Sequence, residues 1–267
     1  MAIVDAQIHL WRKGSNRPPH RPQPYDFEEA IRDMDEAGVD AAIIHPPVTW
    51  DPDSNELAIE AAQAYPQRFA IFGCPPLDRP DSPEIIRTLK QQPGMLGLRF
   101  YFRQPHNQSW PFDGTLDWLW PAAEEAGLPT ALLADDWLPT LGKIAGRHPG
   151  LKLMVDHMGA VRGKGDAAFP NMKELIALAR YPNVAVKLTG GPFYAEDPYP
   201  FRSLHKHYRA IHEAFGPDRL FWGTDITKMP CSWRECVTHF QEIDWIPEVD
   251  KKRIMGDAIC DWIGWER

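Results

Sequence analysis

Three polar residues spaced two apart, Asp5, Gln7 and His9, lie in the otherwise apolar stretch VDAQIHLW near the start of the chain. Side chains two positions apart in a β-strand point to the same face of the sheet. Ionisable groups inside apolar strands cost free energy unless they are paired or functional. A carboxylate, an amide and an imidazole on one strand face therefore indicate acid–base or metal chemistry.

Other apolar runs also carry or end in polar residues. They are His45 after AAII, Arg99 within LGLRFYF, Asp135 and Asp136 after TALLA, Asp156 and His157 after LKLMV, Lys187 within VAVKLTG, and Asp225 after FWGT. Several ionisable groups that converge from different strands are difficult to explain by structure alone. This set therefore predicts a functional site at the strand ends.

Structural roles explain some of these residues equally well. Asp135–Asp136 are expected to cap a helix and begin its first turn. Asp156 is expected to orient a neighbouring side chain. For Asp5, His45 and Lys187, a structural role and a role in the site are both open.

The elements that must position these residues follow one repeated pattern. A helical segment ends at Gly or before Pro, and a short apolar run follows, in EAGVDAAII, AYPQRFAIF, QQPGMLGLRF, EAGLPTALL, RHPGLKLMV, RYPNVAVKL and FGPDRLFWG. Such runs are typical of strands buried on both faces. With an opening strand over Ile3–Leu10 they make eight, which predicts an α/β fold, a (β/α)8 TIM barrel that forms one domain over residues 1–267. A doubly wound sheet is the alternative, but no G-x-G-x-x-G follows the first strand.

Two long segments are expected to cover the mouth of this barrel. Residues 12–25 and 194–202 are rich in Pro, aromatic and basic residues, and both follow predicted strands. Loops after the strands of such a barrel form the active-site face. We therefore expect them to act as substrate walls or lids, with Trp11, Tyr101, Tyr194 and Trp222 as candidate walls for a flat or sugar-like ring.

The composition restricts the class of partner. The 267 residues have a formal net charge of −8, without a basic patch that would bind nucleic acid. The apolar runs are too short to span a membrane, and the N-terminal segment lacks the pattern of a signal peptide. The four cysteines are expected to be reduced thiols. These features predict a cytoplasmic protein that acts on a small molecule, and a homo-oligomer is left open.

The quoted motifs resemble those of the amidohydrolase superfamily, specifically its amidohydrolase-2 branch of lactonases and related decarboxylases. The resemblance covers nearly the full length and rests on VDAQIHLW, GLRFY, VDHMG, VAVKLTG, FWGTDITKMPCSWRE and IMGDAICDWIGW. It implies that His9 and His157 are the site histidines and that Asp225 deprotonates the attacking water. It also implies that Arg99 helps to hold a substrate carboxylate.

Two positions depart from the pattern of that family. Gln7 stands where the resemblance places the first histidine of a His-x-His pair, and Ala134-Asp135 lie where metal-binding members have a Lys or His ligand. A catalytic zinc site needs about three strong ligands and an open position, and an amide oxygen is a poor substitute for imidazole. We therefore expect either no cofactor or one weakly bound divalent metal, zinc or manganese, at Gln7, His9, His157 and Asp225.

The first functional hypothesis is lactone hydrolysis. Asp225 would act as general base on a water, while His9 and His157 would polarise the carbonyl and stabilise the oxyanion. Arg99 would grip a carboxylate. The further substrate-binding candidates are Lys187, Tyr194, Trp11 and His45.

Two other functions are compatible with these residues. One is metal-dependent decarboxylation of an aromatic or unsaturated acid, which Gln7 weakens. The other is a catalytically silent, ligand-binding barrel, against which the retained Asp225 argues.

Overall fold

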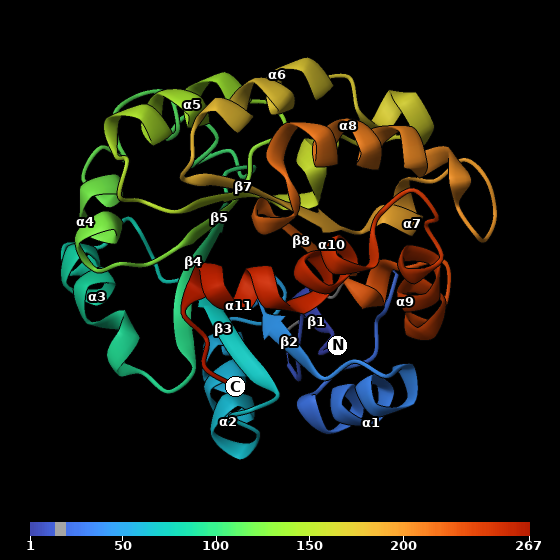
Figure 1. The fold of residues 1–267 in the computed structure, drawn as a ribbon. Helices are drawn as coiled ribbons and strands as arrows, with labels where there is room; N and C mark the ends of the chain where they lie inside the picture. Colours follow the sequence, from blue (N-terminus) through green and yellow to red (C-terminus); the bar gives the residue numbers. More distant parts are fainter. Residues whose placement is uncertain (14–19) are drawn as a thin grey trace.

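The eight predicted strands form one parallel sheet in a computed structural model, which describes residues 1–13 and 20–267 (Figure 1). The strand order in the sheet is the order in the chain. The strands are β1 (Val4–Ile8), β2 (Ala41–Ile44), β3 (Phe69–Gly73), β4 (Met95–Tyr101), β5 (Thr130–Leu133), β6 (Leu153–Val155), β7 (Val184–Thr189) and β8 (Leu220–Gly223). The prediction of a (β/α)8 barrel is confirmed.

Helices surround the sheet and alternate with its strands along the chain (Figure 1). They are α1 (Phe27–Ala37), α2 (Ser54–Ala64), α3 (Ser82–Thr88), α4 (Leu119–Glu125), α5 (Leu138–Arg147), α6 (Met172–Ala177), α7 (Gly191–Tyr194), α8 (His205–Phe215), α9 (Trp233–Gln241), α10 (Glu248–Lys252) and α11 (Ala258–Ile263). Within the described residues, no helix is both long and apolar enough to cross a membrane.

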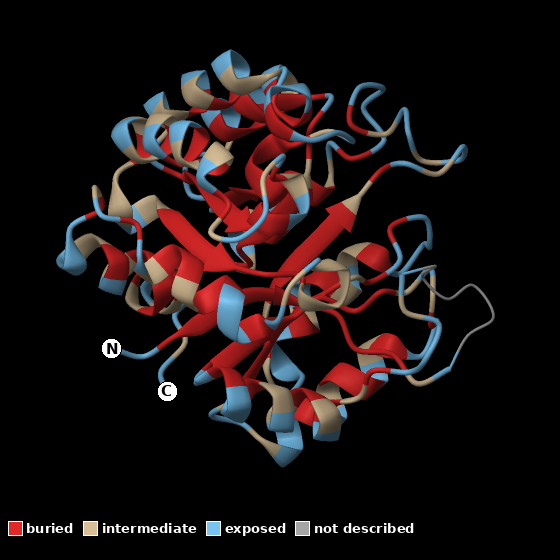
Figure 2. Ribbon diagram, turned by 90° about the vertical axis from the view of Figure 1, so that its right-hand side faces the viewer, coloured by how far each residue is buried: buried red, intermediate tan, exposed pale blue. Residues whose placement is uncertain are grey.

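The helix ends show why the repeated junctions predict this architecture. Gly38 closes α1 in the left-handed conformation, and its N–H donates to the carbonyl groups of Asp35 and Met34. Helix α2 ends just before Pro66, which cannot continue a helix. Each stop turns the chain back into a strand whose residues are almost all buried (Figure 2).

The apolar residues form two cores. The larger one lies between the strands and the surrounding helices. The smaller one fills the interior of the barrel with residues such as Val4, Phe72 and Phe221, and Ala258 and Ile259 of α11 pack against it. Helix α11 therefore plugs the end of the barrel opposite the carboxyl ends of the strands and leaves that second end for the site.

Strands β1 and β8 approach closely where the barrel closes. The Asp225 N–H donates to Gln7 O at 2.9 Å. A Cβ atom on Gly223 would lie 2.8 Å from Ala6 N and from Asp5 Oδ1, so only glycine permits this approach. The opening strand is shorter than the predicted Ile3–Leu10, because the chain leaves the sheet after Ile8 and Trp11 pairs in antiparallel fashion with Tyr25.

Candidate functional site

A cavity of about 280 Å³ opens at the carboxyl ends of the strands. Among the described residues that line it, Asp225 is the single acid, and the lining also includes Tyr194 and His157. Its basic residues are Arg99, Arg103, Arg162 and Lys228. The surplus of positive charge around one carboxylate favours an anionic ligand.

Asp225 and His157 line this cavity, and His9 meets Asp225 beside it, as the sequence predicts. Asp225 Oδ1 lies 3.5 Å from His9 Nε2, and Asp225 Oδ2 lies 3.8 Å from His157 Nε2. His157 and Asp225 both adopt the left-handed conformation, with φ of 52° and 57°. Such backbone strain in residues other than glycine is concentrated at functional sites.

The second ring nitrogens of the two histidines determine their tautomers. His9 Nδ1 donates to the carbonyl of His45 at 2.6 Å, and His157 Nδ1 lies 3.2 Å from the carbonyl and 2.9 Å from the hydroxyl of Thr189. Burial lowers the pKa of His9 to about 3 and that of His157 to about 4, although Asp225 opposes both shifts. Both rings are therefore neutral at pH 7, and each Nε2 carries a lone pair rather than a proton.

Gln7 lies between these two lone pairs. Its amide oxygen accepts from the Lys187 ammonium at 2.6 Å. The amide nitrogen is therefore the atom that faces the histidines, 3.3 Å from Nε2 of His9 and 3.3 Å from Nε2 of His157. Because an amide nitrogen has two hydrogens, it can donate one to each imidazole.

Asp225 is held in its charged form by its neighbours. Lys228 Nζ lies 2.6 Å from Asp225 Oδ2. Burial by itself raises the pKa of Asp225, but the Lys228 ammonium beside it holds this pKa well below its usual range. The other carboxylate oxygen, Oδ1, is buried and has no hydrogen-bond partner among the described residues. This oxygen can therefore accept a hydrogen bond from a water molecule.

A buried ion-pair network lies beneath the cavity. Asp156 accepts from Lys187 Nζ at 2.9 Å and from Arg99 Nε at 3.1 Å. Burial raises the pKa of Asp156, but Lys187 and then Arg99 outweigh this effect and keep it ionised. The interpretation of Asp156 as an orienting residue agrees with this geometry, because it fixes both cations.

The structure brings only some of the predicted substrate-binding residues to the cavity. Arg99 and Tyr194 line it. Lys187 and His45 are almost fully buried below it, where Lys187 Nζ lies 3.2 Å from His45 Nε2. Trp11 is also fully buried, and its indole packs against Trp50 with ring centroids 5.6 Å apart. These three residues are not among those that line the cavity.

The structure describes all of the second predicted lid, residues 194–202, and part of the first. Residues 14–19 of the first predicted lid, 12–25, lie outside the described residues. In the second, Tyr194 packs against His157 with ring centroids 6.5 Å apart. Burial raises the pKa of Tyr194, so its phenol remains a hydrogen-bond donor.

Two neighbours of the site were not predicted from the sequence. Lys228 follows Asp225 by three residues, a spacing that brings side chains together in a helical turn and could have identified it. Trp50, which lies edge-on to His9 with ring centroids 5.5 Å apart, comes from the loop after β2 and has no such local signal.

The predicted metal site was Gln7, His9, His157 and Asp225. The structure brings all four together, but their atoms form a hydrogen-bonded cluster rather than a coordination shell. The only atom of the Gln7 side chain that could bind a metal is its oxygen, and this oxygen accepts a hydrogen bond from Lys187. The amide nitrogen lies next to both imidazoles. Among residues 1–13 and 20–267, no group of three or more His, Cys, Asp or Glu side chains is arranged to hold a metal ion. The residues as placed do not fit a divalent metal.

Comparison with known proteins agrees with the fold and identifies the family. The sequence model of the amidohydrolase family matches residues 4–259. An L-fucono-1,5-lactonase of Burkholderia ambifaria is 27% identical over 83% of this chain and 79% of its own length. A 4-sulfomuconolactone hydrolase of Hydrogenophaga intermedia is 26% identical over 83% of this chain and 73% of its own length.

A solved structure shows the same fold. An amidohydrolase from Burkholderia multivorans with bound zinc superimposes with a TM-score of 0.84 at 19% identity, and the match covers 99% of each chain. Because the identity is low, this likeness establishes the fold of the barrel and not its ligands.

Proposed function

The chain belongs to the amidohydrolase family, and from this premise we propose that it hydrolyses a lactone that carries a negatively charged group. The observation that carries the proposal is Asp225, which lines a cavity together with several cations and has a buried carboxylate oxygen, Oδ1, without a partner among the described residues. The lactone hydrolases among its relatives support the choice of reaction.

The proposed reaction begins with a water held by Asp225. Asp225 Oδ1, which has no hydrogen-bond partner among the described residues, would accept one hydrogen of this water. The water oxygen attacks the lactone carbonyl carbon while Asp225 takes the proton. The C–O bond of the ring then breaks, and the leaving alkoxide takes that proton back from Asp225.

The role of the histidines differs from the first hypothesis. A neutral imidazole whose Nδ1 carries the proton cannot donate from Nε2, so His9 and His157 do not polarise the carbonyl in this scheme. We assign that task to donors at the cavity, the Lys228 ammonium and the Tyr194 phenol. Movement of Lys228 from Asp225 towards the developing oxyanion would also raise the pKa of Asp225 as it takes the proton.

We assign the binding of the negatively charged group of the substrate to Arg99. Its Nε is held by Asp156, which leaves the Nη atoms without a hydrogen-bond partner among the described residues. A guanidinium fixed in this way can bind a carboxylate with little loss of side-chain entropy.

The same proposal includes catalysis without a metal. The orientation of the Gln7 amide supports it, because the nitrogen places two hydrogens where a metal ion would need lone pairs. The Lys187 and Lys228 ammonium groups then supply positive charge near the reacting groups.

A panel of lactones with and without a carboxylate tests the reaction, with proton release followed in the presence of a chelator. We expect turnover of carboxylate-bearing lactones and little turnover of neutral ones. Release of CO2 from an aromatic acid instead of lactone opening would favour the decarboxylase, and no turnover of either class would favour a ligand-binding barrel.

A further inference from the structure

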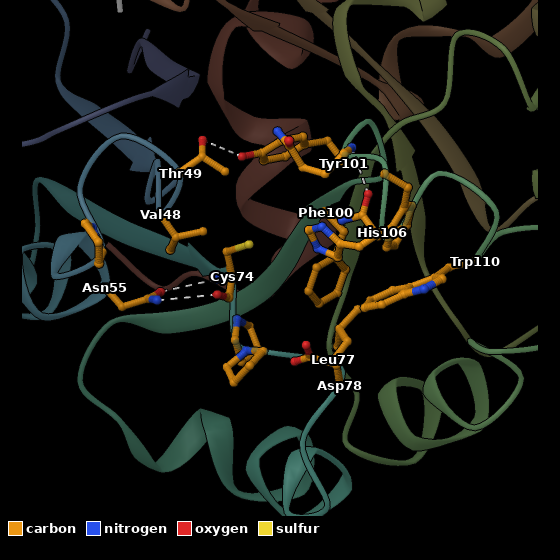
Figure 3. Close-up of a pocket in the computed structure, with 16 residues that line it drawn as sticks. Val48, Thr49, Asn55, Cys74, Leu77, Asp78, Phe100, Tyr101, His106 and Trp110 are labelled. Carbon is orange, nitrogen blue, oxygen red and sulfur yellow. Dashed lines mark hydrogen bonds between the residues drawn. The ribbon is translucent and has the colours of Figure 1, made fainter. Parts of the chain in front are cut away.

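A second cavity of about 340 Å³ lies beside the site, between the loops that follow β2, β3 and β4 (Figure 3). We call it the β3–β4 cavity. Its apolar lining comprises Val48, Pro52, Cys74, Pro75, Pro76, Leu77, Phe100, Phe102 and Trp110. Its volume lies at the lower end of the range for small-molecule sites.

Some polar groups along its walls are paired within the protein, and Asp78, Gln104, His106 and Asn107 also line it. Asn55 accepts from the backbone N–H of Cys74 and donates to the carbonyl of the same residue, at 3.3 and 3.4 Å. The Tyr101 hydroxyl donates to Thr49 Oγ1 at 2.6 Å (Figure 3). Burial raises the pKa of the Cys74 thiol to about 11, so this side chain is neutral. Most of the lining therefore offers a ligand apolar contact.

The β3–β4 cavity and the candidate site share a wall built by β4. The Arg99 guanidinium carbon, at the candidate site, lies 4.9 Å from the ring centroid of Tyr101, which lines the β3–β4 cavity. Arg99 is also close enough to Cys74 for its charge to oppose the rise in the thiol pKa. A ligand whose carboxylate pairs with Arg99 is thus adjacent to an apolar space.

We propose that the β3–β4 cavity binds an apolar substituent, a short alkyl chain or an aryl ring, on a lactone whose carboxylate pairs with Arg99. This inference rests on the proposed lactonase function and names its substrate class. The apolar part of the lining, from Val48 to Trp110, favours hydrocarbon over a sugar ring, because hydroxyl groups set against these residues would lose water without gaining partners.

The test uses linear carboxylates from butanoate to nonanoate, bound to the whole protein and measured by calorimetry. Each added methylene that enters the cavity should lower Kd by about threefold to fourfold until the space is full. Val48→Trp fills the cavity and should flatten this dependence on chain length. Val249→Trp places the same ring on the surface, at a residue that is 67% exposed, and should retain it.

Trp110→Ala provides a second variant in case Val48→Trp does not fold. It removes one wall of the cavity and should also reduce the gain per methylene. A Kd independent of chain length in the wild type, no binding of nonanoate, or an unchanged dependence in both variants would overturn the inference. Turnover of an unsubstituted lactone carboxylate is measured on the same wild-type sample. If Kd depends on chain length but no lactone is hydrolysed, the proposed lactonase function is refuted, while the preference of the β3–β4 cavity for apolar groups is retained.

Discussion

The amide oxygen of Gln7 lies 2.6 Å from the ammonium nitrogen of Lys187, on the floor of the candidate site. The two residues are 180 positions apart in the chain and come from β1 and β7. This contact determines which end of the Gln7 amide faces the histidines. Since an ammonium group donates and cannot accept, the amide nitrogen must point to the imidazoles.

Replacement of Lys187 should destabilise the protein strongly. Lys187→Met leaves the buried Asp156 with Arg99 as its remaining cation, and removal of one partner of a buried pair costs about 3–5 kcal/mol. Denaturant unfolding measures the change. Lys206→Met, which breaks the exposed Lys206–Asp166 pair, should cost less than about 1 kcal/mol. Equal losses in the two variants would contradict the buried network.

Gln7→His should create a metal site that the wild type lacks. The new imidazole can turn a ring nitrogen towards His9 and His157, where the wild-type amide places hydrogens. Calorimetric titration with zinc should show affinity at least about tenfold above that of the wild type. Unchanged affinity would mean that Gln7 does not occupy a ligand position.

Lys228→Met should shift the acid limb of the pH–rate profile. A general base must be deprotonated, and the contact with Lys228 keeps the pKa of Asp225 well below its usual range. The wild-type kcat/KM should therefore persist as pH falls through 4, and the limb in the variant should move to higher pH. Lys173→Met on α6 is the surface control. An unshifted limb in Lys228→Met would assign the base to another residue.

Asp5 should give the stability of the fold a distinct pH dependence. Burial raises its pKa from 3.8 to about 6, against the opposing hydrogen bonds from Thr224, Gln7 and Trp233. The folded state therefore binds the Asp5 proton more tightly than the unfolded state does. This difference adds about 3 kcal/mol to the free energy of unfolding below pH 3.8, and the contribution is lost as pH rises through 6. Denaturant midpoints in Asp5→Asn should lack this loss. A parallel decline in variant and wild type would exclude Asp5 as its source.

The barrel and its strand-end residues were accessible from the sequence because their signals are local. A junction such as RHPGLKLMV contains both the helix stop and the buried strand, and β6 begins within it. Once eight such strands are counted, Asp225, His9 and His157 must meet at one end of the barrel. The resemblance to the amidohydrolase family is likewise confirmed.

The orientation of the site residues was not accessible because it depends on tertiary contacts. Nothing in VDAQIHLW shows that Lys187 fixes the Gln7 amide or that the indole of Trp11 packs against Trp50. The histidine tautomers depend on the carbonyl groups of His45 and Thr189, which only the folded chain brings close. The sequence therefore predicted which residues meet at the strand ends, whereas the hydrogen bonds that orient them depend on the folded chain.

The most direct test of the account measures lactone hydrolysis by protein stripped of metal, with Asp225→Asn as the comparison. The stripped wild type should retain its turnover, and Asp225→Asn should lose at least about a hundredfold in kcat while it remains folded, because the neutral amide cannot take the proton from water. Undiminished turnover in Asp225→Asn would contradict the assignment of the base, and a wild type that loses its activity on stripping and regains it with zinc would contradict the metal-free scheme.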